Sequence, residues 1–154
     1  MAYDRYDWHS GGDYPAGLDE ECAGTHIGMF LAWAITRNLI GDFHKAESAE
    51  WIQKVKERKV TGRDFLFSMC DGKFWEEDLS EEGNAFCKVY YAGDDGYGKY
   101  VEDYENAVCP NTESIYHAED TWENFDKLAL IIDKEYNNWK NPPKNGVFSR
   151  LFKR

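Results

Sequence analysis

Long uncharged hydrophobic runs are missing from this 154-residue chain. Its longest apolar stretch, residues 27–35, is half of the roughly 18 residues that a membrane-spanning helix needs. The first residues also lack the basic segment and apolar core of a secretory signal. We therefore expect no membrane partner and a cytoplasmic location.

Paired cysteines and established catalytic motifs are lacking as well. The four cysteines are widely separated: Cys22, Cys70, Cys87 and Cys109. None of them forms the Cys-x-x-Cys pair that many zinc and redox sites use. A cytoplasmic chain long enough to bury its own core needs no disulfide, so four free thiols are predicted. A Gly-x-Ser-x-Gly elbow, a His-Glu-x-x-His pair and a phosphate-binding loop are all absent. No cofactor is expected.

Positive charge is scarce outside the C-terminal end. The chain has 18 basic and 29 acidic residues and a net charge of −11. Residues 140–154 hold five basic and no acidic side chains, so the preceding 139 residues carry a net charge of −16. Such a field repels nucleic acid and attracts basic partners. The simpler interpretation is that the acidity only keeps the protein dissolved.

Hydrophobic periodicity predicts a single all-α domain of five to six helices over residues 1–141, followed by a basic tail, 142–154. Residues 1–24 contain Gly and Pro without helical spacing, and their aromatic side chains argue against disorder, so we expect an ordered loop. Residues 26–39 are apolar all round and should form the buried central helix.

Capping signals predict where other helices begin. A helix over about 46–59 should precede a capping box at Thr61 and Asp64. The acids that follow Leu79 are typical of a helix N-terminus. The last helix should begin after Asp120 or Thr121 and end before the two prolines at 142–143. No segment shows the period-two alternation of a strand.

Histidines and carboxylates near the N-terminus make a metal site the sharpest enzymatic hypothesis. His9 and Asp13 are spaced for local chelation, and His26 opens the central helix beside them. A second pair of this kind is His117 and Asp120. The structural alternative is that Trp8, His9, Asp13 and His26 only fasten the N-terminal loop to the central helix.

An acidic and aromatic region is the second candidate site. Residues 71–105 contain eleven carboxylates interleaved with aromatic side chains. Aromatic side chains anchor protein interfaces and charge steers the partner toward them, whereas charge runs are also typical of solvated helix faces. The residues predicted to bind a basic protein are Glu76, Glu77, Asp78, Asp94, Asp95, Tyr97, Glu102 and Asp103.

Four blocks resemble a widespread family of small acidic bacterial proteins, most of them uncharacterised: residues 8–15 (WHSGGDYP), 25–33 (THIGMFLAW), 61–66 (TGRDFL) and 120–126 (DTWENFD). The resemblance covers nearly the whole chain except the basic tail. It implies a bacterial cytoplasmic single-domain protein that serves as an immunity protein between competing bacteria. It brings no known catalytic residue.

Three hypotheses follow. In the first, the chain is a non-enzymatic immunity protein that covers the active site of a basic toxin acting in the cytoplasm. In the second, it is a small metal-dependent hydrolase or ligand-binding protein that uses His9, Asp13 and His26. The third is an adaptor without a toxin, whose neighbouring gene should encode nothing toxic.

Overall fold

The computed structural model describes residues 1–93 and 98–142. Its centre is helix α2 (Thr25–Thr36), in which every residue except Thr36 is buried. This confirms the prediction of a helix that is apolar on all sides. The helix ends three residues earlier than expected, because Asn38 turns the chain with a positive φ of 59°.

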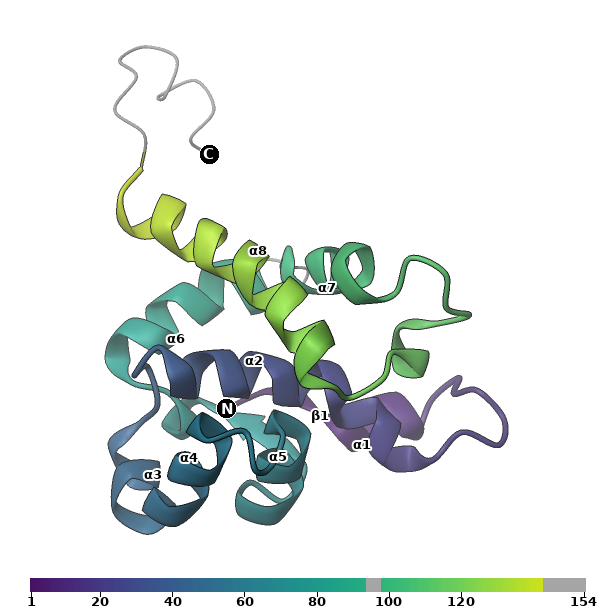
Figure 1. The fold of residues 1–154 in the computed structure, drawn as a ribbon, viewed down its shortest axis with the longest axis horizontal. Coiled ribbons are helices and arrows are strands. Elements are labelled where there is room, and N and C mark those ends of the chain that lie inside the picture. The colour runs from purple at the N-terminus through teal and green to yellow at the C-terminus, as the bar shows by residue number, and fades with distance from the viewer. Residues whose placement is uncertain (94–97, 143–154) are drawn as a thin grey trace.

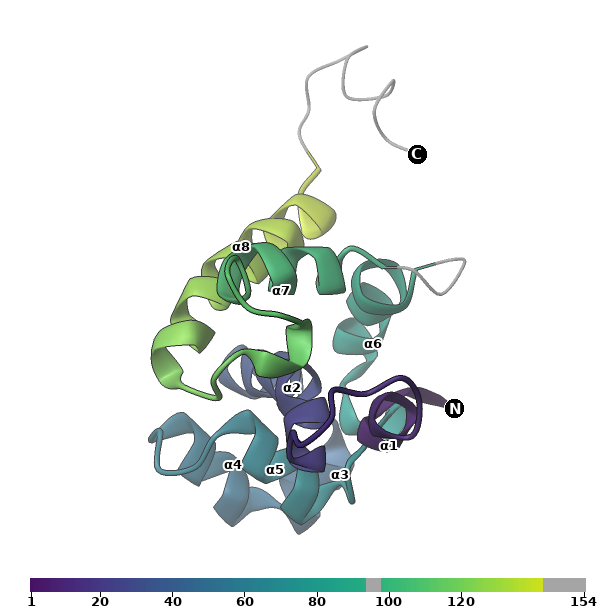
Figure 2. The same cartoon turned by 90° about the vertical axis from the view of Figure 1, so that its right-hand side faces the viewer.

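Two groups of helices enclose α2 (Figures 1 and 2). On one side lie α3 (Asp42–Glu47), α4 (Ala49–Lys56) and α5 (Gly62–Met69). On the other side lie α7 (Tyr100–Val108) and α8 (Trp122–Lys140). Figure 2 shows α2 nearly end-on between these two layers. The fold is therefore a single compact helical domain in three layers.

The connection between the layers is helical too. Helix α6 (Glu81–Cys87) begins at Ser80, whose side chain accepts a hydrogen bond from the Gly83 amide. It continues into a π-helical turn, Lys88–Ala92. The expected helix after Leu79 is thus present, but it changes its hydrogen-bonding pattern near its end. That wide turn directs both Tyr90 and Tyr91 into the core.

The N-terminal segment corrects two predictions. Instead of a long loop it contains strand β1 (Ala2–Arg5), helix α1 (Tyr6–Ser10) and a 3₁₀-helix at Glu20–Gly24. Strand β1 pairs in antiparallel fashion with β2 (Lys73–Trp75), and Asp4 lies opposite Phe74. The fold is therefore mostly helical rather than purely so. These strands have only four and three residues, too few to show an alternation of apolar and polar side chains in the sequence.

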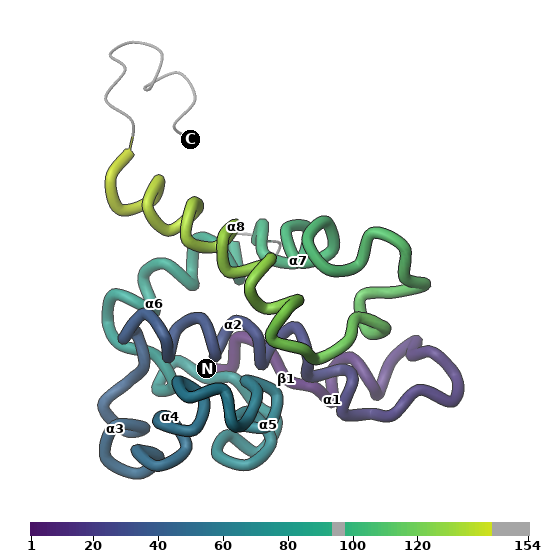
Figure 3. Tube along the Cα trace, in the orientation of Figure 1, coloured from purple at the N-terminus to yellow at the C-terminus, as the bar shows by residue number. Residues whose placement is uncertain are grey.

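In Figure 3 the N-terminal segment can be traced as it passes beside β2, which belongs to the middle of the chain.

The structure also corrects the helix predicted over 46–59, because Ser48 separates α3 from α4. The capping box is confirmed: Thr61 accepts from the Asp64 amide and Asp64 accepts from the Thr61 amide. Short 3₁₀-helices complete the described chain at Glu76–Asp78 and Ile115–His117.

The four cysteines are free thiols, as predicted. Among the described residues, no helix combines the length and the apolar character that crossing a bilayer requires. The expected basic tail lies almost wholly outside the described residues, as do Asp94, Asp95 and Tyr97.

Candidate functional site

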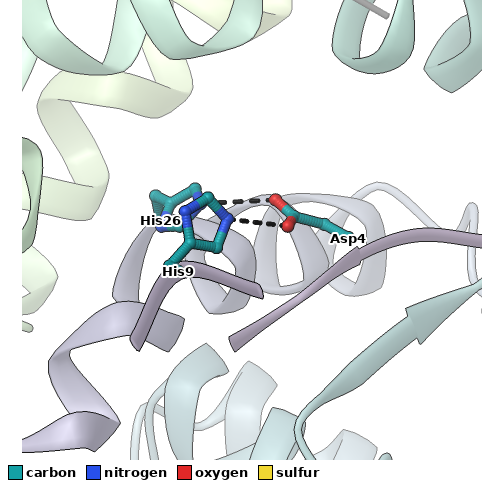
Figure 4. Close-up of side chains that lie close together, drawn as sticks. All are labelled: Asp4, His9 and His26. Atoms are coloured by element: carbon teal, nitrogen blue, oxygen red, sulfur yellow. Dashed lines mark hydrogen bonds and ion pairs between the residues drawn. The ribbon is translucent and has the colours of Figure 1, made fainter. Parts of the chain in front are cut away.

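Three side chains from separate N-terminal elements meet beside α2: Asp4 from β1, His9 from α1 and His26 from the first turn of α2 (Figure 4). In Figure 4 both imidazole rings face the carboxylate of Asp4, one on each oxygen. We call these three residues the Asp4 cluster. Their ligand atoms all lie within 4.8 Å of one another.

Asp4 is the buried carboxylate of the cluster. It is 8% exposed and lies on a strand held by β2. Its Oδ1 lies 2.8 Å from His9 Nε2, and its Oδ2 accepts a 2.6 Å hydrogen bond from the Tyr91 hydroxyl. The π-helical turn that carries Tyr91 therefore helps to orient the carboxylate.

His9 is held at both ring nitrogens. Its Nε2 faces Asp4, and its Nδ1 lies 2.7 Å from the hydroxyl of Tyr116. Because Tyr116 belongs to the segment that precedes α8, this bond joins α1 to a segment 107 residues further along the chain. His9 is partly exposed and also contacts the ring of His26 edge-on, with centroids 4.6 Å apart.

His26 is the unusual member, because it is 1% exposed and neither of its ring nitrogens makes a hydrogen bond with the part of the chain that the structure describes. Its Nε2 lies 3.3 Å from Asp4 Oδ2, an ion-pair distance. The hydroxyl of Tyr104, whose ring contacts that of His26, is also buried without a partner. Buried polar atoms are paired in most proteins, so an unpaired imidazole needs an explanation.

The electrostatics of the pair favour a charged carboxylate beside a neutral imidazole. Burial raises the pKa of Asp4, but the neighbouring rings of His26 and His9 outweigh it, and the pKa lies below its ordinary value. Burial lowers the pKa of His26, and the nearby carboxylate of Asp4 offsets this only in part. An ionised carboxylate and a neutral imidazole are the forms in which these groups bind metals.

A cleft of about 460 Å³ adjoins the cluster. Asp4 and His9 contribute to its wall, together with Tyr3, Trp8, Tyr91 and Val101. The indole of Trp8 is 56% exposed, and the side chain of Val101 is 40% exposed. A cleft lined mainly by aromatic and apolar side chains, with a few polar groups among them, is typical of a small-molecule site.

The structure brings together two of the predicted metal ligands and leaves out the third. Asp13 is exposed and contributes nothing to the cluster, and Asp4 supplies the carboxylate instead. The other predicted pair does not form either. The Nδ1 atom of His117 bonds to Ser114, whereas the carboxylate of Asp120 accepts from Thr61 and pairs with Arg63.

The residues predicted to form an acidic interface differ in their exposure to solvent. Glu77 and Glu102 are exposed, and Glu76 is partly exposed. Asp78 and Asp103 are buried and bonded inside the fold, to His44 and Tyr90 respectively. Among the described residues, Asp78 and Asp103 therefore stabilise the fold and are not available at the surface to bind a partner.

Sequence reasoning missed Asp4, Tyr91 and Tyr116. Asp4 lies five residues before His9, a separation that no helical or strand pattern favours for chelation. Tyr91 and Tyr116 reach the cluster from segments that are 87 and 107 residues away from their partners. Only the tertiary fold brings these groups together.

A search of curated proteins found no match, and neither did a search of solved structures. A family profile does match, over residues 2–118, and this range includes Asp4, His9, His26 and the β2 strand. The chain belongs to that family, which is described as a domain of unknown function, DUF7832.

Proposed function

We propose that the Asp4 cluster binds a divalent transition metal and that the chain acts on a small ligand in the adjoining cleft, as a metal-dependent hydrolase or ligand-binding protein. The observation that carries the proposal is His26, a fully buried imidazole whose two nitrogens make no hydrogen bond to the described residues, although one of them lies at ion-pair distance, 3.3 Å, from Asp4. A metal ion would give that nitrogen a partner.

Two imidazoles and one carboxylate form a common ligand set for catalytic zinc and for non-haem iron. Three protein ligands leave a coordination position for water, whose pKa a zinc ion lowers to near 7. The surrounding bonds match the outer shell of such a site. The hydroxyls of Tyr116 and Tyr91 bond to His9 and Asp4 at 2.7 and 2.6 Å, as groups that fix metal ligands do.

Metal content tests this proposal. Protein purified without chelator should hold about one transition metal ion per chain at this cluster, and the Asp4→Asn and His26→Ala variants should lose it. His117→Ala is the matched control, because His117 lies outside the cluster and is bonded to Ser114. An unchanged metal content in both cluster variants would contradict the proposal, as would a wild-type protein that takes up no zinc, iron or manganese on dialysis.

A second candidate function rests on charge. We propose that the surface carboxylates of Glu76, Glu77 and Glu102 bind a basic protein, as an immunity protein binds a toxin that acts in the cytoplasm. The supporting observation is that Glu77 borders a groove whose wall includes Phe43, 54% exposed, and Trp75. An exposed carboxylate beside aromatic rings suits the side chain of an arginine or lysine.

Co-expression tests this second function. The product of the neighbouring gene should arrest growth when expressed alone, and this chain should restore growth and bind the product directly. A harmless neighbour, or a toxic one that this chain neither binds nor neutralises, would rule out an immunity role and favour the adaptor hypothesis.

A further inference from the structure

A second cluster of metal-ligand side chains comes from the middle of the chain: His44, Cys70 and Asp78. His44 comes from α3, Cys70 follows α5, and Asp78 ends the 3₁₀-helix after β2. His44 Nε2 is 2.7 Å from Asp78 Oδ1. Cys70 Sγ lies 3.7 Å from that same nitrogen and 3.8 Å from the same oxygen.

Each of the two buried members is oriented by a further bond. His44 is 0% exposed, and its Nδ1 lies 2.9 Å from the Ser48 hydroxyl. Asp78 is 4% exposed, and its Oδ2 accepts a 2.6 Å hydrogen bond from the Trp75 amide. These bonds leave His44 Nε2 and Asp78 Oδ1 directed toward the thiol, as the outer shell of a metal site directs its ligands.

The distances are close to those of tetrahedral zinc. Bonds of about 2.0–2.1 Å to nitrogen and oxygen and about 2.3 Å to sulfur separate the ligand atoms by roughly 3.3–3.6 Å. The two distances to Cys70 Sγ already lie near that range. The separation of His44 Nε2 and Asp78 Oδ1 must widen by about 0.6 Å, and the two distances to the sulfur must shorten slightly.

The cluster borders a groove of about 620 Å³. Cys70 and Asp78 form part of the groove wall, together with Phe43, Met69 and Trp75. Three protein ligands beside an open groove leave a fourth position for water or a ligand, whereas a closed structural zinc site has four protein ligands.

The geometry does not favour a cysteine nucleophile here. In a cysteine–histidine pair the imidazole takes the thiol proton, and a third group orients the imidazole through its other nitrogen. In this cluster Asp78 and Cys70 approach the same nitrogen, His44 Nε2, while the other nitrogen bonds to Ser48. Burial and the charge of Asp78 also raise the pKa of the Cys70 thiol, which keeps it protonated in the absence of a cation.

We infer that His44, Cys70 and Asp78 form a zinc site that is independent of the Asp4 cluster, with its fourth coordination position toward the groove. Zinc bonds to Sγ as the thiol proton leaves to solvent, and the proton shared by His44 Nε2 and Asp78 moves to Nδ1, where the Ser48 hydroxyl can accept it. One proton is therefore released per ion bound at this sulfur. No oxidation is involved. His44 Nε2 and one oxygen of Asp78 complete the protein ligands.

Cobalt(II) substitution tests the inference, because a cobalt–thiolate bond gives an intense near-ultraviolet charge-transfer band. Only this cluster contains a thiolate ligand, so the band is not produced by cobalt at the Asp4 cluster. Cobalt added to chelator-treated Asp4→Asn protein, in which the Asp4 cluster is disabled, should give the band with an endpoint of one ion per chain, and zinc should abolish it.

The variants make the assignment specific. Cys70→Ser should abolish the band, whereas Cys22→Ser, which changes a similarly half-buried cysteine outside the cluster, should keep it. Asp78→Asn keeps an acceptor for the Trp75 amide and should weaken cobalt binding at least tenfold, with circular dichroism confirming that the variant is folded. A wild-type protein without the band, or a Cys70→Ser variant that keeps it, would overturn the inference.

Discussion

The backbones of Gly28 and Gly62 touch where α2 meets α5. A Cβ atom built on Gly62 would overlap the carbonyl oxygen of Gly28, and one built on Gly28 would overlap the backbone of Arg63. Both overlaps involve backbone atoms, which cannot rotate away as a side chain does. This contact sets how closely the layer of α3–α5 approaches the central helix, whose first turn carries His26.

We expect Gly62→Ala to destabilise the protein by about 1–3 kcal/mol or more, because the added methyl group forces α5 away from α2. Chemical denaturation measures the change. Gly17→Ala is a control without a steric clash, since nothing lies within 4 Å of a Cβ there, although its φ of 80° adds some strain. A Gly62→Ala variant as stable as the wild type would show that the two helices can separate freely.

The Thr61 cap should matter more than the Thr121 cap. Each hydroxyl accepts from the amide three residues later, and replacing such a cap by Ala costs about 1 kcal/mol. Thr61 also donates a 2.7 Å hydrogen bond to Asp120, a largely buried carboxylate whose pKa is raised by burial. Thr61→Ala should therefore lower the free energy of unfolding more than Thr121→Ala, and equal losses would argue that Asp120 finds another donor.

Stability should fall on mild acidification of metal-free protein. The unfolded chain protonates His26 near pH 6.5, whereas burial lowers the pKa of His26 in the fold. Between these two values the unfolded state binds more protons, so the free energy of unfolding decreases as the pH falls below 6.5. One such group contributes at most about 1.4 kcal/mol per pH unit.

Denaturation at a series of pH values, with chelator present, measures this slope. His26→Gln should remove most of it between pH 6.5 and 5, and His117→Gln should keep it. The carboxylate of Asp4 stays ionised across this interval because its own pKa is lowered. If the slope persists in His26→Gln, another histidine must be the source.

Charge reversal should affect the stability of the protein far less at the exposed Glu77 than at the buried Asp78. Glu77→Lys changes an exposed side chain and should alter stability by less than about 0.5 kcal/mol. Asp78→Lys removes the partner of His44 and buries an ammonium group, which should cost about 3–5 kcal/mol or prevent folding. Thermal unfolding of the two variants makes the comparison. Similar melting temperatures would mean that Asp78 can turn outward.

Asp133 links a buried indole to a surface cation. It accepts a 2.8 Å hydrogen bond from the Trp33 ring nitrogen and two bonds from Arg37. Asp133→Asn keeps an acceptor for Trp33 and loses only a half-exposed ion pair, so it should cost less than about 1 kcal/mol. Asp133→Leu leaves the indole N–H unpaired and should cost about 1–3 kcal/mol. Denaturation curves that show the reverse order would contradict this account.

Local signals in the sequence predicted much of the helical fold. The Thr61–Asp64 box, the Thr121 cap of α8 and the all-round apolar helix α2 depend on neighbouring residues, so the chain itself reveals them. The β1–β2 pair could not be predicted in this way, because strands of four and three residues carry no measurable alternation.

The candidate site was predictable only in part. The unusual positions of His9 and His26 identified them as members, but the spacing of His9 and Asp13 predicted Asp13 as the carboxylate, and the structure has Asp4 in that place. The second cluster joins residues 44, 70 and 78, whose spacings match no metal-binding motif. In both clusters, tertiary contacts place the carboxylate, and in the second cluster also the thiol, beside the histidine.

The short β1–β2 pair connects the two clusters of metal-ligand side chains. Asp4 on β1 pairs with Phe74 on β2, and the chain continues from β2 within four residues to Asp78. One short ladder thus holds a carboxylate of each cluster at a fixed separation. An ion that shifts the ladder at one cluster would change affinity at the other, and thermodynamic linkage requires the influence to be equal in both directions.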